Sequence, residues 1–314
     1  MKARHRGVRP SRMSGVMGIL HSCIMGTLPW VPEPLMRRLS GRYIAGESLP
    51  EAMDVISTNA SRGFAGVLDI LGEGVEDEAA AREALSAYKE AASELGAAGL
   101  DCYVSVKPTH FGLSISPGLA LDLYVELAEH CQALGQAMRV EMEDHPTTDA
   151  TLDLFHSLRK QFNDVGIVLQ SRLLRTPDDI EALGSEVMDV RMVKGIYLEP
   201  ASIAHVEPEP ISDAFLDCCE RLWTGGARVT LATHDGKLAG HLSALIAARG
   251  LTDLDYEFQV LLGVQRPLWE EWRASGHPVR VYVPFGPEWR AYSQRRLKNT
   301  PQLLGYILAS LLRR

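Results

Sequence analysis

The sequence predicts an α/β protein built as a (β/α)8 barrel of the TIM-barrel type, with N-terminal helices and a C-terminal helix. From residue 60 onward, short apolar runs alternate regularly with segments of helical periodicity. The spacing of the runs leaves room for a strand, a helix and two short loops in each unit. Nearly continuous apolar character within each run is typical of parallel strands that are buried on both faces.

Eight strand candidates share Val, Leu and Ile cores and are bounded by turn residues. The last one is closed by Pro284 and Gly286, which we interpret as the start of a loop. In chain order the predicted strands are Ala65–Leu71, Asp101–Val106, Ala137–Met142, Gly166–Leu169, Val190–Val193, Arg228–Ala232, Tyr256–Leu261 and Val279–Val283.

The segments between these strands carry helix signals, such as Ala- and Glu-rich composition, period-3.6 apolar positions and capping residues. The predicted helices are Asp77–Leu95, Pro117–Leu134, Thr148–Phe162, Pro177–Leu183, Ser212–Trp223, Lys237–Arg249, Pro267–Ala274, Trp289–Leu297 and a terminal helix from Pro301.

An open doubly wound sheet is the alternative architecture. The Gly72-Glu73-Gly74 segment after the first strand has the wrong spacing for a dinucleotide-binding turn, and the sequence contains no Walker-type loop. No Pro-, Gly- or Ser-rich linker interrupts the series of units. We therefore expect residues 46–314 to form one catalytic barrel, preceded by a helical and basic extension over residues 1–45.

The composition limits the class of protein. Its 314 residues are 46% hydrophobic and carry a formal net charge of -8, which disfavours a nucleic-acid surface because phosphate binding needs a basic patch. The five cysteines form no C-x-x-C pair, so neither a disulfide framework nor a zinc site is predicted. We expect a reducing cytoplasm.

The first dozen residues are basic and precede an apolar stretch from Val16 to Trp30. This resembles a targeting peptide in outline, but it lacks an A-x-A cleavage site and is too short to span a bilayer. We expect a helix that packs on the domain or lies at the inner face of the membrane, so that peripheral membrane contact is an alternative to a purely cytoplasmic location.

The active site of such a barrel lies at the carboxyl ends of its strands. The predicted strand ends are unusually polar, and burying so many ionisable groups costs several kcal/mol each unless they are paired or face a ligand. These residues are Asp69, Glu73, Lys107, Thr109, Glu141, Glu143, Asp144, His145, Gln170, Arg191, Lys194, Tyr197, Thr233, His234, Asp235, Glu257, Gln259 and Tyr282.

A second polar group follows the last strand. Tyr292, Arg295 and Arg296 share one face of a predicted helix. Two guanidiniums beside an aromatic wall suit a small molecule that has a carboxylate and an apolar body. A solvated basic helix is the ordinary explanation of such a pair.

The residues alone leave other enzymes open. A Schiff-base lyase or aldolase would use Lys107 or Lys194 as nucleophile, with Glu141 or Glu143 as proton carrier. A metal-dependent hydrolase is a weaker alternative, because the cluster around His145 lacks a second His–carboxylate set at convincing spacing. We predict no metal site.

Six segments, in order and at similar spacing, resemble the bacterial monofunctional proline dehydrogenases, which are FAD-dependent enzymes with a distorted barrel. The likeness runs from about residue 40 to the C-terminus. The segments are Asp69-Ile70-Leu71-Gly72-Glu73, Val104-Ser105-Val106-Lys107, Arg191-Met192-Val193-Lys194-Gly195-Ile196-Tyr197, Ala232-Thr233-His234-Asp235, Glu257-Phe258-Gln259 and Tyr292-x-x-Arg295-Arg296.

The resemblance implies oxidation of L-proline to Δ1-pyrroline-5-carboxylate by hydride transfer to the flavin, the first step of proline catabolism to glutamate. Arg295 and Arg296 would clamp the substrate carboxylate with help from Lys107, and Glu73 would pair with Arg295 as a gate. The ring of the substrate would be walled by Tyr197, Tyr282 and Tyr292. Glu141 stands where the family has an Asp.

For the cofactor, the resemblance implies that Gln170 and Arg191 lie near the isoalloxazine ring, with Arg191 close to N5. The rest of FAD would be lined by Lys194, Gly195, Thr233, His234 and Gln259. The implied partners are a quinone or another electron acceptor and a separate dehydrogenase that oxidises the semialdehyde product.

Several positions depart from the family pattern. Besides Glu141, Ile196 replaces a usual Ala, Met192 replaces a common Leu, and Asn299 replaces a common acidic residue. Such changes alter selectivity by about 1–3 kcal/mol in a tight pocket. A relative that oxidises another cyclic amino acid, or one that binds without turnover, therefore stays open.

Overall fold

A computed structural model describes residues 36–37, 40–184, 188–290 and 292–294. The chain divides into two compact units, one of residues 41–289 and the other of residues 1–40 together with 290–314. The first unit contains the whole barrel. In the second, residues 36–37, 40, 290 and 292–294 are helical. The domain boundary expected after residue 45 stays a prediction.

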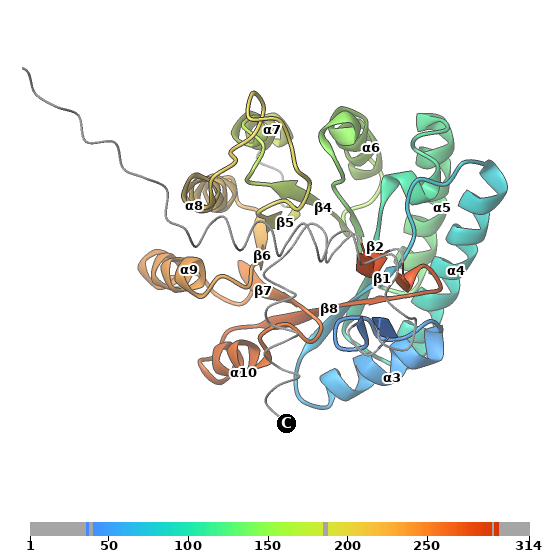
Figure 1. Cartoon of the computed structure of the whole chain (residues 1–314), viewed down its shortest axis with the longest axis horizontal. Helices are drawn as coiled ribbons and strands as arrows, with labels where there is room; N and C mark the ends of the chain where they lie inside the picture. Colours follow the sequence, from blue (N-terminus) through green and yellow to red (C-terminus); the bar gives the residue numbers. More distant parts are fainter. Residues whose placement is uncertain (1–35, 38–39, 185–187, 291, 295–314) are drawn as a thin grey trace, which may run out of the picture. The chain divides into compact units, whose positions relative to one another are not determined.

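Eight strands form a closed parallel barrel in sequence order, which confirms the predicted fold class (Figure 1). Pairing of β8 with β1, with Tyr282 opposite Val67, closes the ring. The strands are β1 Ala65–Ile70, β2 Cys102–Val106, β3 Met138–Val140, β4 Val165–Gln170, β5 Asp189–Val193, β6 Arg228–Ala232, β7 Tyr256–Leu261 and β8 Val279–Phe285.

Helices surround this barrel (Figure 1). They are α3 Leu49–Ala60, α4 Glu78–Ala97, α5 Pro117–Ala133, α6 Thr148–Arg159, α7 Thr176–Leu183, α8 Pro208–Thr224, α9 Gly236–Arg249 and α10 Arg266–Ala274, with short 3-10 turns η2 Pro108–Phe111 and η3 His145–Thr147. No helix in the described part of the chain has the length and apolar character needed to cross a bilayer.

Helix α3, for which no range was predicted, packs against β8 and β1 on the outside of the barrel. It begins with a capping box, in which Ser48 and Glu51 satisfy each other's backbone amides. Its buried residues include Ala52 and Ile56. In Figure 1 it lies between α10 and α4, so it covers the strands where the barrel closes.

Strand β8 runs two residues beyond the predicted end at Val283. Proline lacks an amide donor and is usually a strand breaker. Here the Pro284 carbonyl accepts the Ala45 amide at 2.9 Å, so the residue still takes part in hydrogen bonding at the barrel mouth.

The lower part of the barrel interior, toward the amino ends of the strands, is filled by ion pairs. We call Arg139, Asp189, Arg228, Glu257 and Arg280 the floor layer. Asp189 pairs with Arg139 at 2.9 Å and with Arg228 at 3.1 Å, while Glu257 pairs with Arg228 at 3.0 Å and with Arg280 at 2.9 Å. Each carboxylate is thus shared by two guanidiniums, which meets the requirement that buried charges be paired.

A glycine makes room for one of these guanidiniums. A Cβ added to Gly166 on β4 would lie 2.7 Å from the Asp189 carbonyl oxygen and 3.5 Å from the Arg139 guanidinium carbon. A side chain at this inward position would therefore displace the Arg139–Asp189 pair.

Candidate active site

The upper part of the barrel interior holds a second set of polar side chains, at the carboxyl ends of the strands. We call Asp69, Lys107, Glu141, Arg191, Gln259 and Tyr282 the mouth layer. Five of the six belong to the predicted site, and Asp69 had been noted only as a polar strand end.

Lys107 and Asp69 come from neighbouring strands. Lys107 directly follows β2 and its Nζ donates to both Asp69 carboxylate oxygens, at 3.0 and 3.1 Å. The Asp69 side chain is only 1% exposed and that of Lys107 12%. Burial, together with the nearby Glu141 charge, raises the pKa of Asp69, while Lys107 opposes that change. The pair fixes the ammonium at the mouth of the barrel.

Glu141, which directly follows β3, is the central acceptor of the mouth layer. One carboxylate oxygen pairs with Arg191, and the other accepts the Ser105 hydroxyl at 2.5 Å and the Tyr282 hydroxyl at 3.2 Å. Burial alone would raise its pKa, but Arg191 and Lys107 prevail and hold the pKa below its ordinary value. Glu141 is therefore an ionised carboxylate inside the barrel.

Arg191 on β5 reaches across the barrel to β7 and β8. Its Nη1 donates to Gln259 Oε1 at 3.0 Å, and its guanidinium carbon lies 5.0 Å from the centre of the Tyr282 ring. Burial disfavours the cation, yet Glu141 raises the pKa of Arg191 above its usual value. The guanidinium is thus a fixed positive charge with defined orientation.

Two buried polar atoms on the neighbouring strands β4 and β5 have no hydrogen-bond partner among the described residues. They are Arg191 Nε on β5 and Gln170 Oε1 at the end of β4. Gln170 Nε2, by contrast, donates to the Glu143 carbonyl at 2.6 Å, which holds the amide in place. Buried polar groups are normally satisfied. A donor and an acceptor left over on neighbouring strands fit a planar ligand with both kinds of group, as an isoalloxazine ring has.

Gly195, after β5, adopts φ +94°, and an added Cβ would lie 2.6 Å from Gln170 Oε1. Only glycine combines this backbone conformation with that close approach. The residue therefore keeps the space beside Gln170 clear, consistent with its predicted place at the cofactor.

The remaining predicted cofactor residues lie at the ends of β5 to β7. Lys194 Nζ pairs with Asp235 at 2.7 Å, and the Thr233 hydroxyl accepts the Asp235 amide at 3.1 Å. His234 Nε2 accepts the Leu261 amide at 3.2 Å. Burial would raise the pKa of Asp235, but its bonds to Lys194 and to the first amides of α9 lower it. These contacts order the loop that begins α9.

Two predicted residues lie on loops at the rim of the mouth. Tyr197 is half-buried in the β5–α8 loop, and its carbonyl accepts Arg172 Nη1 at 2.7 Å. Glu73 is half-buried in the β1–α4 loop, next to Gly74, whose amide donates to the Thr109 hydroxyl at 2.9 Å. Both loops leave the carboxyl ends of their strands, as the prediction requires.

The predicted carboxylate clamp is not placed by the structure. Tyr292 is half-buried and helical but belongs to the second compact unit. Arg295 and Arg296 lie outside the described residues. Their roles stay predictions.

Sequence reasoning missed two inward-facing residues of β2. Tyr103 and Ser105 precede Lys107 by four and two positions, so the period-2 alternation of a strand places all three on one face. That alternation was the signal that could have found them. It could not have shown that Ser105 reaches Glu141, because the pairing register of β2 with β3 is a property of the folded barrel.

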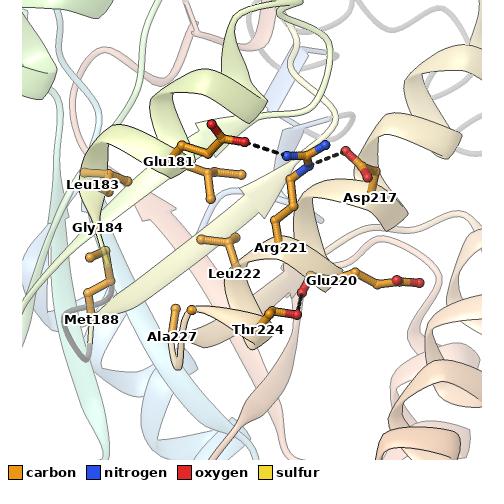
Figure 2. Close-up of a pocket in the computed structure, with 12 residues that line it drawn as sticks. Glu181, Leu183, Gly184, Met188, Asp217, Glu220, Arg221, Leu222, Thr224 and Ala227 are labelled. Atoms are coloured by element: carbon orange, nitrogen blue, oxygen red, sulfur yellow. Dashed lines mark hydrogen bonds and ion pairs between the residues drawn. The ribbon is translucent and has the colours of Figure 1, made fainter.

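A cavity of about 570 Å³ lies away from these residues. Its walls come from the ends of α7 and α8 and from Met188 and Ala227, which precede β5 and β6, so it opens at the amino ends of the strands. Figure 2 shows Arg221 at its edge, paired with Glu181 at 2.9 Å and with Asp217 at 2.7 Å. None of the predicted site residues lines it, and catalytic sites of parallel barrels lie at the opposite end.

The geometry also bears on the alternative enzymes. Lys107 and Lys194 both lie in ion pairs with carboxylates, whereas an amine nucleophile is usually held in an apolar pocket or beside another cation. Glu141 forms an ion pair with Arg191. Glu143 accepts hydrogen bonds from the Thr109 amide at 2.9 Å and from the Thr109 hydroxyl at 2.7 Å. These pairings disfavour a Schiff-base lyase.

Comparison with known proteins shows the family of the chain. A sequence model of the proline dehydrogenase family matches residues 52–300. The proline dehydrogenase of Deinococcus radiodurans is 32% identical over 283 residues, which span 88% of this chain and 91% of that protein. Proline dehydrogenase 1 of Bacillus subtilis strain 168 is 27% identical over 273 residues, spanning 87% of this chain and 90% of that protein.

Among solved structures, proline utilization A (PutA) of Bdellovibrio bacteriovorus, inactivated by N-propargylglycine, has a TM-score of 0.77 at 21% identity. The match covers 83% of this chain and 32% of that one, so it supports the fold. The family match covers most of the sequence and includes every strand of the barrel. The chain therefore belongs to the proline dehydrogenase family.

Proposed function

We propose that the protein catalyses the FAD-dependent oxidation of L-proline to Δ1-pyrroline-5-carboxylate, the first step of proline catabolism to glutamate. The observation that carries this proposal is that Arg191 Nε on β5 and Gln170 Oε1 at the end of β4 have no partner in the part of the chain that the structure describes. In a member of the proline dehydrogenase family, a flavin ring is the ligand whose edge matches that pair.

When bound, FAD supplies the acceptor for the hydride that leaves the substrate ring carbon next to nitrogen. Arg191 and Gln170 would hold the ring, and Lys194, Gly195, Thr233, His234 and Gln259 would hold the rest of the cofactor. Arg191 is a permanent cation oriented by Glu141 and Gln259. Such a charge stabilises negative charge on its ligand without reorganisation.

For the substrate, Lys107 offers an ammonium held by Asp69, and Arg295 and Arg296 would supply the carboxylate clamp. A planar carboxylate gripped in this way is fixed in both distance and orientation. Tyr197, Tyr282 and Tyr292 would wall the ring. Proline must lose its ammonium proton before hydride can leave, and the nearby positive charges favour the neutral amine.

The test is a visible spectrum of the purified protein followed by anaerobic addition of L-proline. Blue-light absorption that bleaches on addition is the expected result. Bleaching by another cyclic amino acid but not by proline would change the substrate, a bound flavin that no such compound reduces would indicate a relative without turnover, and a colourless protein that takes up no added FAD would refute the proposal.

Electrons must then leave the reduced enzyme, and we infer a membrane quinone as acceptor and a separate dehydrogenase for the semialdehyde product. The basic and apolar N-terminal sequence supports peripheral contact with an anionic membrane from the cytoplasmic side. Deleting residues 1–32 is expected to weaken binding to anionic liposomes and to leave dye-linked proline oxidation intact. Unchanged liposome binding would contradict the membrane role of this segment.

A further inference from the structure

Tyr103 on β2 lies between the floor layer and the mouth layer. The residue is 7% exposed. Its ring centre lies 4.7 Å from the Arg280 guanidinium carbon and 5.0 Å from that of Arg139, both in the floor layer. Its hydroxyl oxygen accepts Gln259 Nε2 at 3.2 Å. Tyr103 therefore contacts both layers through different parts of one side chain.

The Gln259 contact determines how the amide is turned. A guanidinium only donates hydrogen bonds, so Gln259 must present Oε1 to Arg191, as it does at 3.0 Å. This leaves the Gln259 amino group directed at Tyr103, whose oxygen receives it. Without that oxygen, the buried amino group would lose its acceptor and the amide would lose the contact that sets its orientation.

The floor layer, in turn, holds the Tyr103 ring. Arg280 is tied to Glu257 and to the Gly66 carbonyl at 2.8 Å, and Arg139 is tied to Asp189. Guanidiniums near an aromatic face are attracted to it by its quadrupole. Burial raises the pKa of Tyr103, so the phenol stays protonated and acts by hydrogen bonding rather than by charge.

We propose that Tyr103 is a positioning residue whose hydroxyl orients the Gln259 amide and, through it, the Arg191 guanidinium at the cofactor. This inference rests on the proposed flavin-dependent function. The floor layer would then contribute to the reaction indirectly, because its arginines hold Tyr103, the residue that orients the mouth layer.

The test compares Tyr103→Phe with Tyr124→Phe in the FAD-loaded protein. Tyr124 is a matched control, because it is also buried and its hydroxyl donates one bond, to the Val106 carbonyl at 2.7 Å, from α5 outside the barrel. The flavin midpoint potential is measured by chemical reduction, and the rate of flavin reduction by L-proline and the KM are measured separately.

Tyr103→Phe is expected to make the midpoint potential more negative by about 30 mV, which corresponds to a tenfold weaker preference for the reduced flavin. Flavin reduction by proline should slow by roughly tenfold, with KM changed by less than about twofold, since orientation at the reacting centre is lost and substrate binding is not. Tyr124→Phe should leave potential and rate unchanged. An unchanged potential in Tyr103→Phe would overturn the proposal.

A double variant covers the case in which Tyr103→Phe does not fold. In Gln259→Met the amino group that needs an acceptor is gone, so adding Tyr103→Phe creates no unsatisfied donor. If Tyr103 acts through Gln259, the second change leaves the potential of Gln259→Met unaltered; a further shift would overturn the proposal.

Different results would refute the proposed function and the positioning role of Tyr103. A protein that binds flavin but is not reduced by proline refutes the substrate assignment and still allows the potential of each variant to be compared. A protein that binds no flavin overturns both.

Discussion

Lys107 and Asp69 form a buried ion pair, and we expect the two residues to have different roles. Asp69 is almost fully enclosed, and burial raises its pKa. Lys107 is the partner that makes an ionised Asp69 tolerable in this position. The pair therefore links the stability of the barrel mouth to the charge that substrate binding would use.

Lys107→Met is expected to destabilise the protein by about 3–5 kcal/mol, because it leaves the Asp69 carboxylate buried without its cation. Adding Asp69→Asn should restore most of that loss, since no unpaired charge remains. Reduction of the flavin by proline should fail in both variants. Urea denaturation and anaerobic spectra measure the two effects, and recovery of activity in the double variant would contradict a substrate role for Lys107.

His110 is a second buried titratable residue, in the turn after Lys107. An added Cβ on Gly72 would lie 2.2 Å from its Nε2, so the ring packs directly under the β1–α4 loop that carries Glu73. Its Nδ1 has no hydrogen-bond partner among the described residues. Burial, and then the Lys107 charge, lower the pKa of His110 from 6.5 to about 4.

This shift makes stability depend on pH. The unfolded chain takes up the proton as the pH falls below 6.5, whereas the folded protein resists it until about pH 4. Stabilisation of up to about 3 kcal/mol is therefore present above pH 6.5 and is lost as the pH falls toward 4. In His110→Gln, urea denaturation should show a smaller loss over this range. Equal slopes in wild type and His110→Gln would contradict the assignment.

At the scale of elements, strand alternation explains the two polar layers. Inward positions recur every second residue, so Arg139 and Glu141, or Asp189 and Arg191, place one charge in the floor and one at the mouth. The floor layer links β3, β5, β6, β7 and β8 and has every carboxylate shared by two guanidiniums. We expect this layer to stabilise barrel closure.

Arg280→Met should reduce the free energy of unfolding by about 3–5 kcal/mol, because Glu257 and Asp101 lose a buried partner on β8. Arg221→Met also removes an arginine with two carboxylate partners, but these ion pairs lie at the exposed edge of the cavity in Figure 2, so the loss should be much smaller. Chemical denaturation compares the two. Equal losses would contradict a structural role for the floor layer.

Most elements could be predicted from the sequence, because strand and helix periods alternate without interruption. The observed elements differ from the predicted ones at a few places. Pro284 marked the end of β8, yet the strand continues because Pro284 and Phe285 still pair with Asp69 and Ile70 of β1. Helix α3 received no range, although Ser48 and Glu51 give a local capping-box signal in the sequence. Turns η2 and η3 are shorter than any periodicity can detect.

At the scale of the whole molecule, the barrel separates stability from chemistry along its axis. Ion pairs fill the amino end, and the mouth layer fills the carboxyl end, where Arg191 Nε and Gln170 Oε1 have no partner among the described residues. Tyr103 joins the two. This arrangement places the candidate site at the end where parallel barrels carry their active sites.

The structure brings several of the candidate residues together, while their roles in a site stay predictions. Strand-end position and family resemblance were enough to select Lys107, Glu141 and Arg191. They could not show that Glu141 pairs with Arg191 or that Lys107 pairs with Asp69, because each pair joins residues from different strands and depends on side-chain reach across the barrel. The clamp of Arg295 and Arg296 lies outside the described residues and stays a prediction.

The location of the cofactor is the most direct test. A crystal structure of the FAD-loaded protein should place the isoalloxazine ring at the carboxyl ends of β4 and β5, within hydrogen-bond distance of Gln170 Oε1 and Arg191 Nε. A flavin bound in the cavity at the opposite end of the barrel, or a ring that leaves both atoms without a partner, would contradict the assignment of the site.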